Sequence, residues 1–144
     1  MKKSTPRVRL VLLVDDDEDV RVSLRALLVS HGYAIAEARD GQQALDYLQD
    51  NPPPCLILLD LVMPRMDGWE FLTLKAQDKK LAALPVVITS GTVANLPPNF
   101  AVVRKPWNVA DLLSLVRKYS LPLMLVFTLS GVKICLAAAL CRRP

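Results

Sequence analysis

Carboxylates directly follow two apolar runs of this chain, and their positions suggest chemistry with a divalent cation. Asp15 and Asp16 come after residues 10–14, and Asp60 comes after residues 55–59. Two such runs are expected to be neighbouring buried parallel strands, whose carboxyl ends open onto one crevice. Carboxylates that meet there repel one another unless a hard, oxygen-preferring cation such as Mg2+ neutralises them. One of these acids would then be placed to attack phosphorus as a nucleophile.

A lysine near the end of a third apolar run could supply a matching positive charge. Lys105 follows residues 100–103 and Arg104. Phosphoryl transfer needs an in-line nucleophile, a cation that spans the phosphoryl and carboxylate oxygens, and fixed positive charge on the equatorial oxygens. Asp60, Mg2+ and Lys105 match these three roles.

The acidic run also has a structural interpretation. Acids that precede a helix commonly accept hydrogen bonds from its first N–H groups, and Asp17, Glu18 and Asp19 are expected to do so. For Asp15 and Asp16, metal binding is favoured over capping, because they come first after the apolar run.

The elements that must position these residues alternate between strand and helix. Short apolar runs predict strands over residues 10–14, 33–38, 55–59, 86–89 and 100–103, and helical periodicity predicts helices over 19–30, 41–49, 69–84 and 108–119, the last capped by Asn108. This alternation predicts an α/β fold with a doubly wound parallel sheet. Residues 91–99 are too few for a full crossover helix, so the fourth helix is expected to be a turn or two at most.

Composition bounds the class of protein. A chain of 144 residues with 52% hydrophobic content is expected to form one domain. The net charge of +4 lies at the ends, because residues 10–120 hold 11 basic and 14 acidic residues. The central domain is therefore not expected to bind nucleic acid. Three cysteines without metal spacing, and a polar start unlike a signal peptide, favour a cytoplasmic location.

Four motifs, each at a strand end and in this order, carry a resemblance to a known family. They are residues 10–16 (LVLLVDD), residues 59–68 (LDLVMPRMDG), residues 85–91 (PVVITSG) and Lys105-Pro106. Over residues 8–120 the chain resembles the CheY-like receiver domain of two-component response regulators. The resemblance implies a flavodoxin-like, five-stranded parallel sheet of order 2-1-3-4-5.

The resemblance also implies a role for each acid of the cluster. Asp60 corresponds to the phosphoacceptor and is also a predicted metal ligand. Asp15 and Asp16 correspond to the pair that holds Mg2+ directly or through water. The backbone carbonyl of Val62, two residues past Asp60, corresponds to a further metal ligand.

Two further residues correspond to the parts that respond to phosphorylation. Ser90 matches the switch hydroxyl, with Thr89 as the competing hydroxyl, and Lys105 matches the phosphate-pairing lysine. The family commonly has a cis peptide before Pro106, so one is expected here. Val102 departs from the pattern, because the family usually places an aromatic residue three positions before the lysine. With the short fourth helix, this departure suggests a remodelled output surface.

The expected function is that of a single-domain response regulator. Asp60 would receive a phosphoryl group from a sensor histidine kinase or a phosphotransfer protein, and the phosphorylated surface would bind a downstream partner. Such a module catalyses only its own phosphorylation and dephosphorylation. No helix-turn-helix pattern follows residue 120, so direct DNA binding is not expected. The alternative is an adaptor that binds partners without phosphorylation; a phosphatase is disfavoured, because Val62 stands where a general acid is needed.

The domain prediction has three parts: a basic tail over residues 1–9, the receiver over 10–120 and an apolar tail over 121–144. Residues 121–141 are almost entirely apolar apart from Lys133. They are long enough for a membrane anchor, although Lys133 near the middle would cost about 2.5–3.5 kcal/mol. Packing on the domain or on a second copy, or an extension without function, are the other interpretations.

Overall fold

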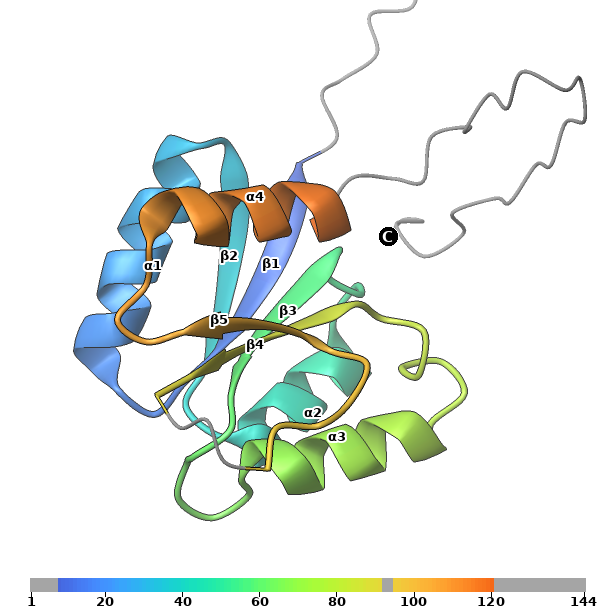
Figure 1. The fold of residues 1–144 in the computed structure, drawn as a ribbon. Helices are drawn as coiled ribbons and strands as arrows, with labels where there is room; N and C mark the ends of the chain where they lie inside the picture. The colour runs from blue at the N-terminus through green and yellow to red at the C-terminus, as the bar shows by residue number, and fades with distance from the viewer. Residues whose placement is uncertain (1–7, 92–94, 121–144) are drawn as a thin grey trace, which may run out of the picture.

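The computed structural model describes residues 8–91 and 95–120. Five parallel strands form one sheet in the order β2-β1-β3-β4-β5 (Figure 1). The elements are β1 (Arg9–Val14), α1 (Glu18–Ser30), β2 (Tyr33–Ala38), α2 (Gly41–Asp50), β3 (Leu56–Asp60), α3 (Gly68–Gln77), β4 (Val86–Ser90), β5 (Ala101–Arg104) and α4 (Val109–Ser120). The predicted α/β fold class and strand order are confirmed.

Helices cover both faces of the sheet. Helices α1 and α4 pack on one face and α2 and α3 on the other (Figure 1). Successive side chains of a strand point to opposite faces, so Val11 and Leu13 of β1 join the α1/α4 core while Leu12 and Val14 join the α2/α3 core. Central strands of this kind are buried on both sides, which is why their sequences are continuous apolar runs.

Side-chain caps set the beginnings of the helices. Asp17 accepts hydrogen bonds from the backbone N–H groups of Asp19 and Val20 at the start of α1. Asn108 accepts them from Ala110 and Asp111 at the start of α4. The predicted capping role is thus confirmed for Asp17 and Asn108. Asp17 is the N-cap of α1, whereas Glu18 and Asp19, also expected to cap, lie in its first turn.

Helix α3 is shorter than predicted. The apolar pattern predicted a helix over residues 69–84, but α3 ends at Gln77. Asp78 leaves the helical backbone conformation, with ψ at 114°. Its carbonyl accepts hydrogen bonds from the N–H groups of Leu81 and Ala82, which starts a separate turn. Leu81 is buried in that turn and so continues the apolar pattern without extending the helix.

The connection from β4 to β5 differs from every other crossover of the sheet. A helix lies between each of the other consecutive strands, whereas the described residues between Ser90 and Ala101 contain none. The prediction of a shortened fourth helix is consistent with this connection. Within residues 8–91 and 95–120, α2 and α3 are therefore the two helices that cover this face of the five-stranded sheet.

The terminal segments of the domain prediction lie largely outside the described residues. The structure does not describe residues 1–7 and 121–144, so the interpretations of the apolar tail stay predictions. Within residues 8–91 and 95–120, no helix combines the length and apolar character needed to cross a bilayer.

Candidate functional site

The three predicted metal-binding acids meet at the carboxyl edge of the sheet. Strands β1 and β3 are hydrogen-bonded neighbours, with Val14 level with Leu59, so the next residue of each is an aspartate at the same edge. Carboxylate oxygens of Asp15, Asp16 and Asp60 lie within 4.8 Å of one another. Asp15 and Asp60 are buried, while Asp16 is exposed. We call these three residues the acidic cluster.

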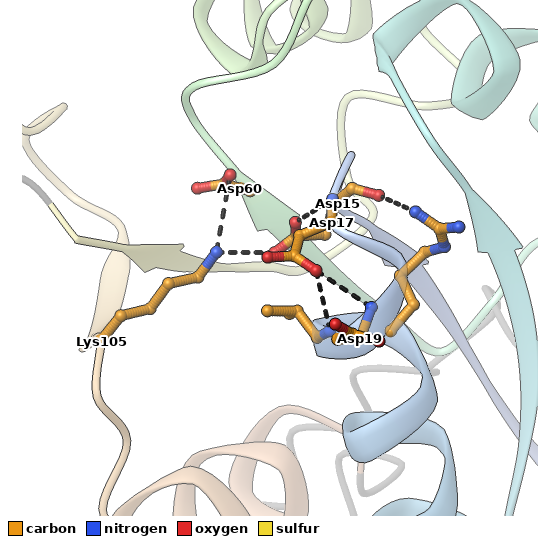
Figure 2. Close-up of polar contacts among 7 residues, drawn as sticks. Asp15, Asp17, Asp19, Asp60 and Lys105 are labelled. Carbon is orange, nitrogen blue, oxygen red and sulfur yellow. Dashed lines mark hydrogen bonds and ion pairs between the residues drawn. The ribbon is translucent and has the colours of Figure 1, made fainter.

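Lys105 contacts both buried acids of the cluster. Its Nζ lies 2.7 Å from Oδ2 of Asp15 and 3.5 Å from Oδ2 of Asp60 (Figure 2). The backbone N–H of Lys105 donates to the carbonyl of Ser90, which ties this lysine to the end of β4. The peptide bond between Lys105 and Pro106 is cis, as expected.

Charge is imbalanced in the acidic cluster. Burial raises the pKa of Asp60, and the neighbouring Asp15 carboxylate raises it further, while Lys105 acts in the opposite direction. The two buried carboxylates therefore share the single ammonium of Lys105, and Asp16 adds a third negative charge. An all-oxygen donor set with excess negative charge fits a hard divalent cation such as Mg2+.

Two contacts hold Asp15 that the sequence did not indicate. The backbone N–H of Asp17 donates to Oδ1 of Asp15 over 2.9 Å, and Nη1 of Arg21 donates to the Asp15 carbonyl over 2.6 Å. With Lys105 on Oδ2, both carboxylate oxygens of Asp15 have a donor (Figure 2). The side chain of Asp15 is thus fixed in place.

The loop after Asp60 depends on Gly68. A Cβ atom built on Gly68 would lie 2.5 Å from the carbonyl oxygen of Asp60 and 2.7 Å from Cα of Leu61. The N–H of Gly68 donates to the Leu61 carbonyl over 3.0 Å. Only glycine lets α3 begin this close to Asp60. Val62 lies in the same loop with an exposed side chain, so its predicted role rests on its backbone carbonyl.

A second anchor joins this loop to α2. Asp40, a fully buried residue, caps α2 and forms an ion pair with Arg65 of the loop. The N–H of Gly41 donates to the Met66 carbonyl over 3.0 Å. The sequence did not indicate the Asp40–Arg65 ion pair, because neither residue directly follows an apolar run.

Ser90 is the last residue of β4 and is buried. The register places Thr89 level with Asp60, so Ser90 lies one residue further toward the carboxyl edge, where the side chains of the acidic cluster lie. Both hydroxyl residues are buried. The choice of Ser90 over Thr89 as the switch hydroxyl stays a prediction.

The fold and the acidic cluster define a receiver-type α/β module, and comparison with known proteins gives the family. The model of the response regulator receiver domain family matches residues 11–117. This chain belongs to that family. Curated relatives include the response regulator MprA of Mycobacterium sp. (strain KMS) and of Mycobacterium tuberculosis (strain ATCC 25177 / H37Ra). Each is 48% identical over 60 residues, covering 42% of this chain and 26% of the relative. The aligned segment thus spans about a quarter of those relatives.

Solved structures show the same fold. A response regulator receiver protein from Pseudomonas putida is 26% identical, with a TM-score of 0.70 over 79% of this chain and 99% of that one. The signal receiver domain of a signal transduction histidine kinase from Syntrophus aciditrophicus is 25% identical, with a TM-score of 0.72 over 85% and 99%. Residues 11–117 are therefore a receiver domain of two-component phosphorelay signalling. Receiver domains are signalling modules and not classical enzymes. Receiver domains interact with histidine kinases or phosphotransfer proteins.

Proposed function

We propose that Asp60 accepts a phosphoryl group from the phosphohistidine of a sensor kinase or phosphotransfer protein, with Mg2+ as cofactor. The observation that carries this proposal is the acidic cluster, whose oxygens lie within 4.8 Å of one another beside Nζ of Lys105. Isolated loop acids do not converge in this way. The response regulator family to which the chain belongs supports the same chemistry.

The transfer makes one bond and breaks one. An Oδ atom of Asp60 bonds to phosphorus, while the bond between phosphorus and the donor imidazole nitrogen breaks and its electron pair stays on that nitrogen. Asp15, Asp16, Asp60 and the Val62 carbonyl would hold Mg2+, which would neutralise charge on the phosphoryl oxygens when bound. Lys105 needs only to turn from Asp15 toward a phosphoryl oxygen, since its Nζ is already 3.5 Å from Asp60.

The signal would pass through Ser90. A phosphoryl group adds a charge of about −1.5 to −2 and strong acceptor oxygens. The Ser90 hydroxyl could donate to one of them and draw the end of β4 toward Asp60. The backbone N–H of Lys105 donates a hydrogen bond to the Ser90 carbonyl, so Lys105, at the start of the segment after β5, would move with Ser90. A partner protein would read this surface.

The bounds of the receiver unit, its output partner and its cellular location are part of the proposed function. The described secondary structure runs from Arg9 to Ser120, which supports residues 10–120 as the receiver unit. We propose that its output is a protein partner, not DNA, and that it acts in the cytoplasm as a single-domain regulator. Residues 10–120 carry 14 acidic and 11 basic residues, a balance unfavourable for phosphate-backbone contacts.

The test is Mg2+-dependent labelling by acetyl phosphate, followed by intact mass. Wild type, Asp60→Asn and the control Asp46→Asn, an exposed acid on α2, are compared with Mg2+ and with EDTA. We expect one phosphoryl group on wild type and on the control, none on Asp60→Asn, and none in EDTA. If wild type binds Mg2+ but takes no label from acetyl phosphate or phosphoramidate, the chain is a phosphorylation-independent adaptor instead.

A further inference from the structure

A groove opens at the end of the sheet opposite to the acidic cluster. It has a volume of about 270 Å³ and lies between the C-terminal part of α3, the first residues of β4 and β5, and the end of α4. Its lining includes Leu72, Lys75, Leu84, Val86, Phe100 and Tyr119. The acidic cluster lies at the carboxyl ends of the strands, whereas Val86 and Ala101 begin β4 and β5. We call this surface the β4–β5 groove.

The β4–β5 groove lies beside the crossover whose described residues contain no helix. The other crossovers of the sheet place a helix on one of its faces, but none is found among the described residues between β4 and β5. Apolar side chains of the groove are only partly covered: Phe100 is 37% exposed, and Leu72 is half-buried against the α2/α3 core. The groove therefore leaves apolar surface exposed at the edge of the core, and burying that surface under apolar side chains would be favourable.

A buried lysine in the groove adds a second requirement for its occupant. Lys75 is 5% exposed, and its Nζ donates to the Ala82 carbonyl over 3.0 Å. Burial lowers the pKa of this ammonium. An ammonium has three donors, so an occupant that brings backbone carbonyls as well as apolar side chains would satisfy Lys75 better than a purely apolar one. A polypeptide segment meets both needs.

The chain carries such a segment next to the groove. Tyr119 lines the groove, and residue 121 follows α4 directly after Ser120. Ser120 is buried, and its Oγ donates to the Tyr33 hydroxyl over 3.2 Å, so the end of α4 is anchored. Residues 121–141 are almost entirely apolar and contain no acidic residue. Their covalent attachment at the rim of the groove gives them a high effective concentration there.

We propose that residues 121–141 bind the β4–β5 groove of their own chain and complete the α2/α3 face of the sheet. The bound segment takes the place of a crossover helix, which the described residues between β4 and β5 do not contain. It lies at the amino ends of the strands, so it leaves the acidic cluster accessible to a phosphoryl donor. The inference does not depend on phosphorylation of Asp60.

The test is photo-crosslinking within the full chain. Phe100→p-benzoylphenylalanine keeps an aromatic side chain at a partly exposed groove position, and Val29→p-benzoylphenylalanine on α1, where Val29 is 54% exposed, is the control. At high dilution we expect the position 100 variant to give a monomeric product whose cross-linked peptides map to residues 121–141, at least fivefold more than the control. Products of dimer mass, no cross-link to this segment, or equal yield from both positions would overturn the proposal.

A second measurement does not rely on the photo-reactive residue. Hydrogen exchange is followed in the full chain and in the double variant Val126→Asp/Phe127→Asp, which places charge in the segment. We expect severalfold faster exchange of amides in residues 72–76 and 100–103 and unchanged exchange in residues 22–29. Unchanged exchange at the groove would contradict the proposal. So would loss of the cross-link with co-sedimentation on phosphatidylserine vesicles, because the segment would then belong to a bilayer.

Discussion

The two ends of the sheet satisfy their charged groups in different ways. At the carboxyl end, Asp15 has a donor on each carboxylate oxygen, and Lys105 also reaches Asp60. At the amino end of β4 and β5, the buried ammonium of Lys75 has one carbonyl acceptor among the described residues and an apolar groove beside it. In the functions that we propose, the carboxyl end would hold a cation and a phosphoryl group, and the amino end would hold a chain segment. The two roles would then lie at opposite ends of the same strands.

The largest expected effect is at the carboxyl end, where the backbone is crowded. Gly68→Ala should lower the free energy of unfolding by about 3 kcal/mol, because the added Cβ would lie 2.5 Å from the Asp60 carbonyl oxygen. Gly91→Ala is the matched control, since its Cβ would meet nothing within 4 Å among the described residues. Urea unfolding measures both. Equal stability of the two variants would mean that the β3–α3 loop shifts to accommodate the added Cβ at little cost in free energy.

Removing the Lys105 ammonium should destabilise the two buried carboxylates of the acidic cluster. Without Mg2+, Lys105→Met should lower the free energy of unfolding by about 2 kcal/mol, because Asp15 and Asp60 would then be buried without their ammonium. With Mg2+ present, Lys105→Met should also slow acetyl phosphate labelling. Lys118→Met, a change at an exposed lysine of α4, should alter neither the stability nor the labelling. If Mg2+ fails to restore part of the lost stability, the acids do not share a cation site.

Removing the charge of Asp60 should instead raise the free energy of unfolding. Asp60→Asn, in EDTA, should raise the free energy of unfolding by about 1 kcal/mol at neutral pH, since burial and Asp15 disfavour its charge. The native pKa lies above the ordinary value of 3.8, so wild type loses stability as pH rises through this interval. The advantage of Asp60→Asn should vanish below pH 3.8. Urea titrations across pH measure it; a pH-independent difference would contradict the charge explanation.

The smallest expected effect is at the groove. Lys75→Met should raise the free energy of unfolding by about 0.5 kcal/mol at neutral pH, because the lost hydrogen bond offsets part of the relieved burial cost. The native pKa of Lys75 lies below the ordinary 10.5, so the cost of its charge fades as pH rises toward that value. The advantage of Lys75→Met should therefore shrink in alkaline buffer. Lys79→Met, an exposed neighbour, is the control. A destabilised Lys75→Met would show that the hydrogen bond to Ala82 outweighs the burial.

Local patterns predicted most of the fold. Strand β2 has the bounds expected for residues 33–38, and α1 and α4 begin within one residue of prediction. The predicted end of α3 was wrong, because Leu81 and Leu84 continue an apolar pattern that a turn at Asp78 also accommodates. An apolar residue signals burial, and burial alone does not distinguish a helix from a turn packed on the core.

The sequence by itself determined which residues end the strands, and so which acids could meet. Apolar runs define strands locally, and parallel strands release their next residues at one edge, so Asp15, Asp16 and Asp60 could be placed together from sequence. The tertiary structure alone decided the pairing of Asp40 with Arg65, the close approach of Gly68 to Asp60, and the burial of Lys75 in a groove. These depend on how the loops and helices pack in three dimensions, which no local pattern of residue types encodes.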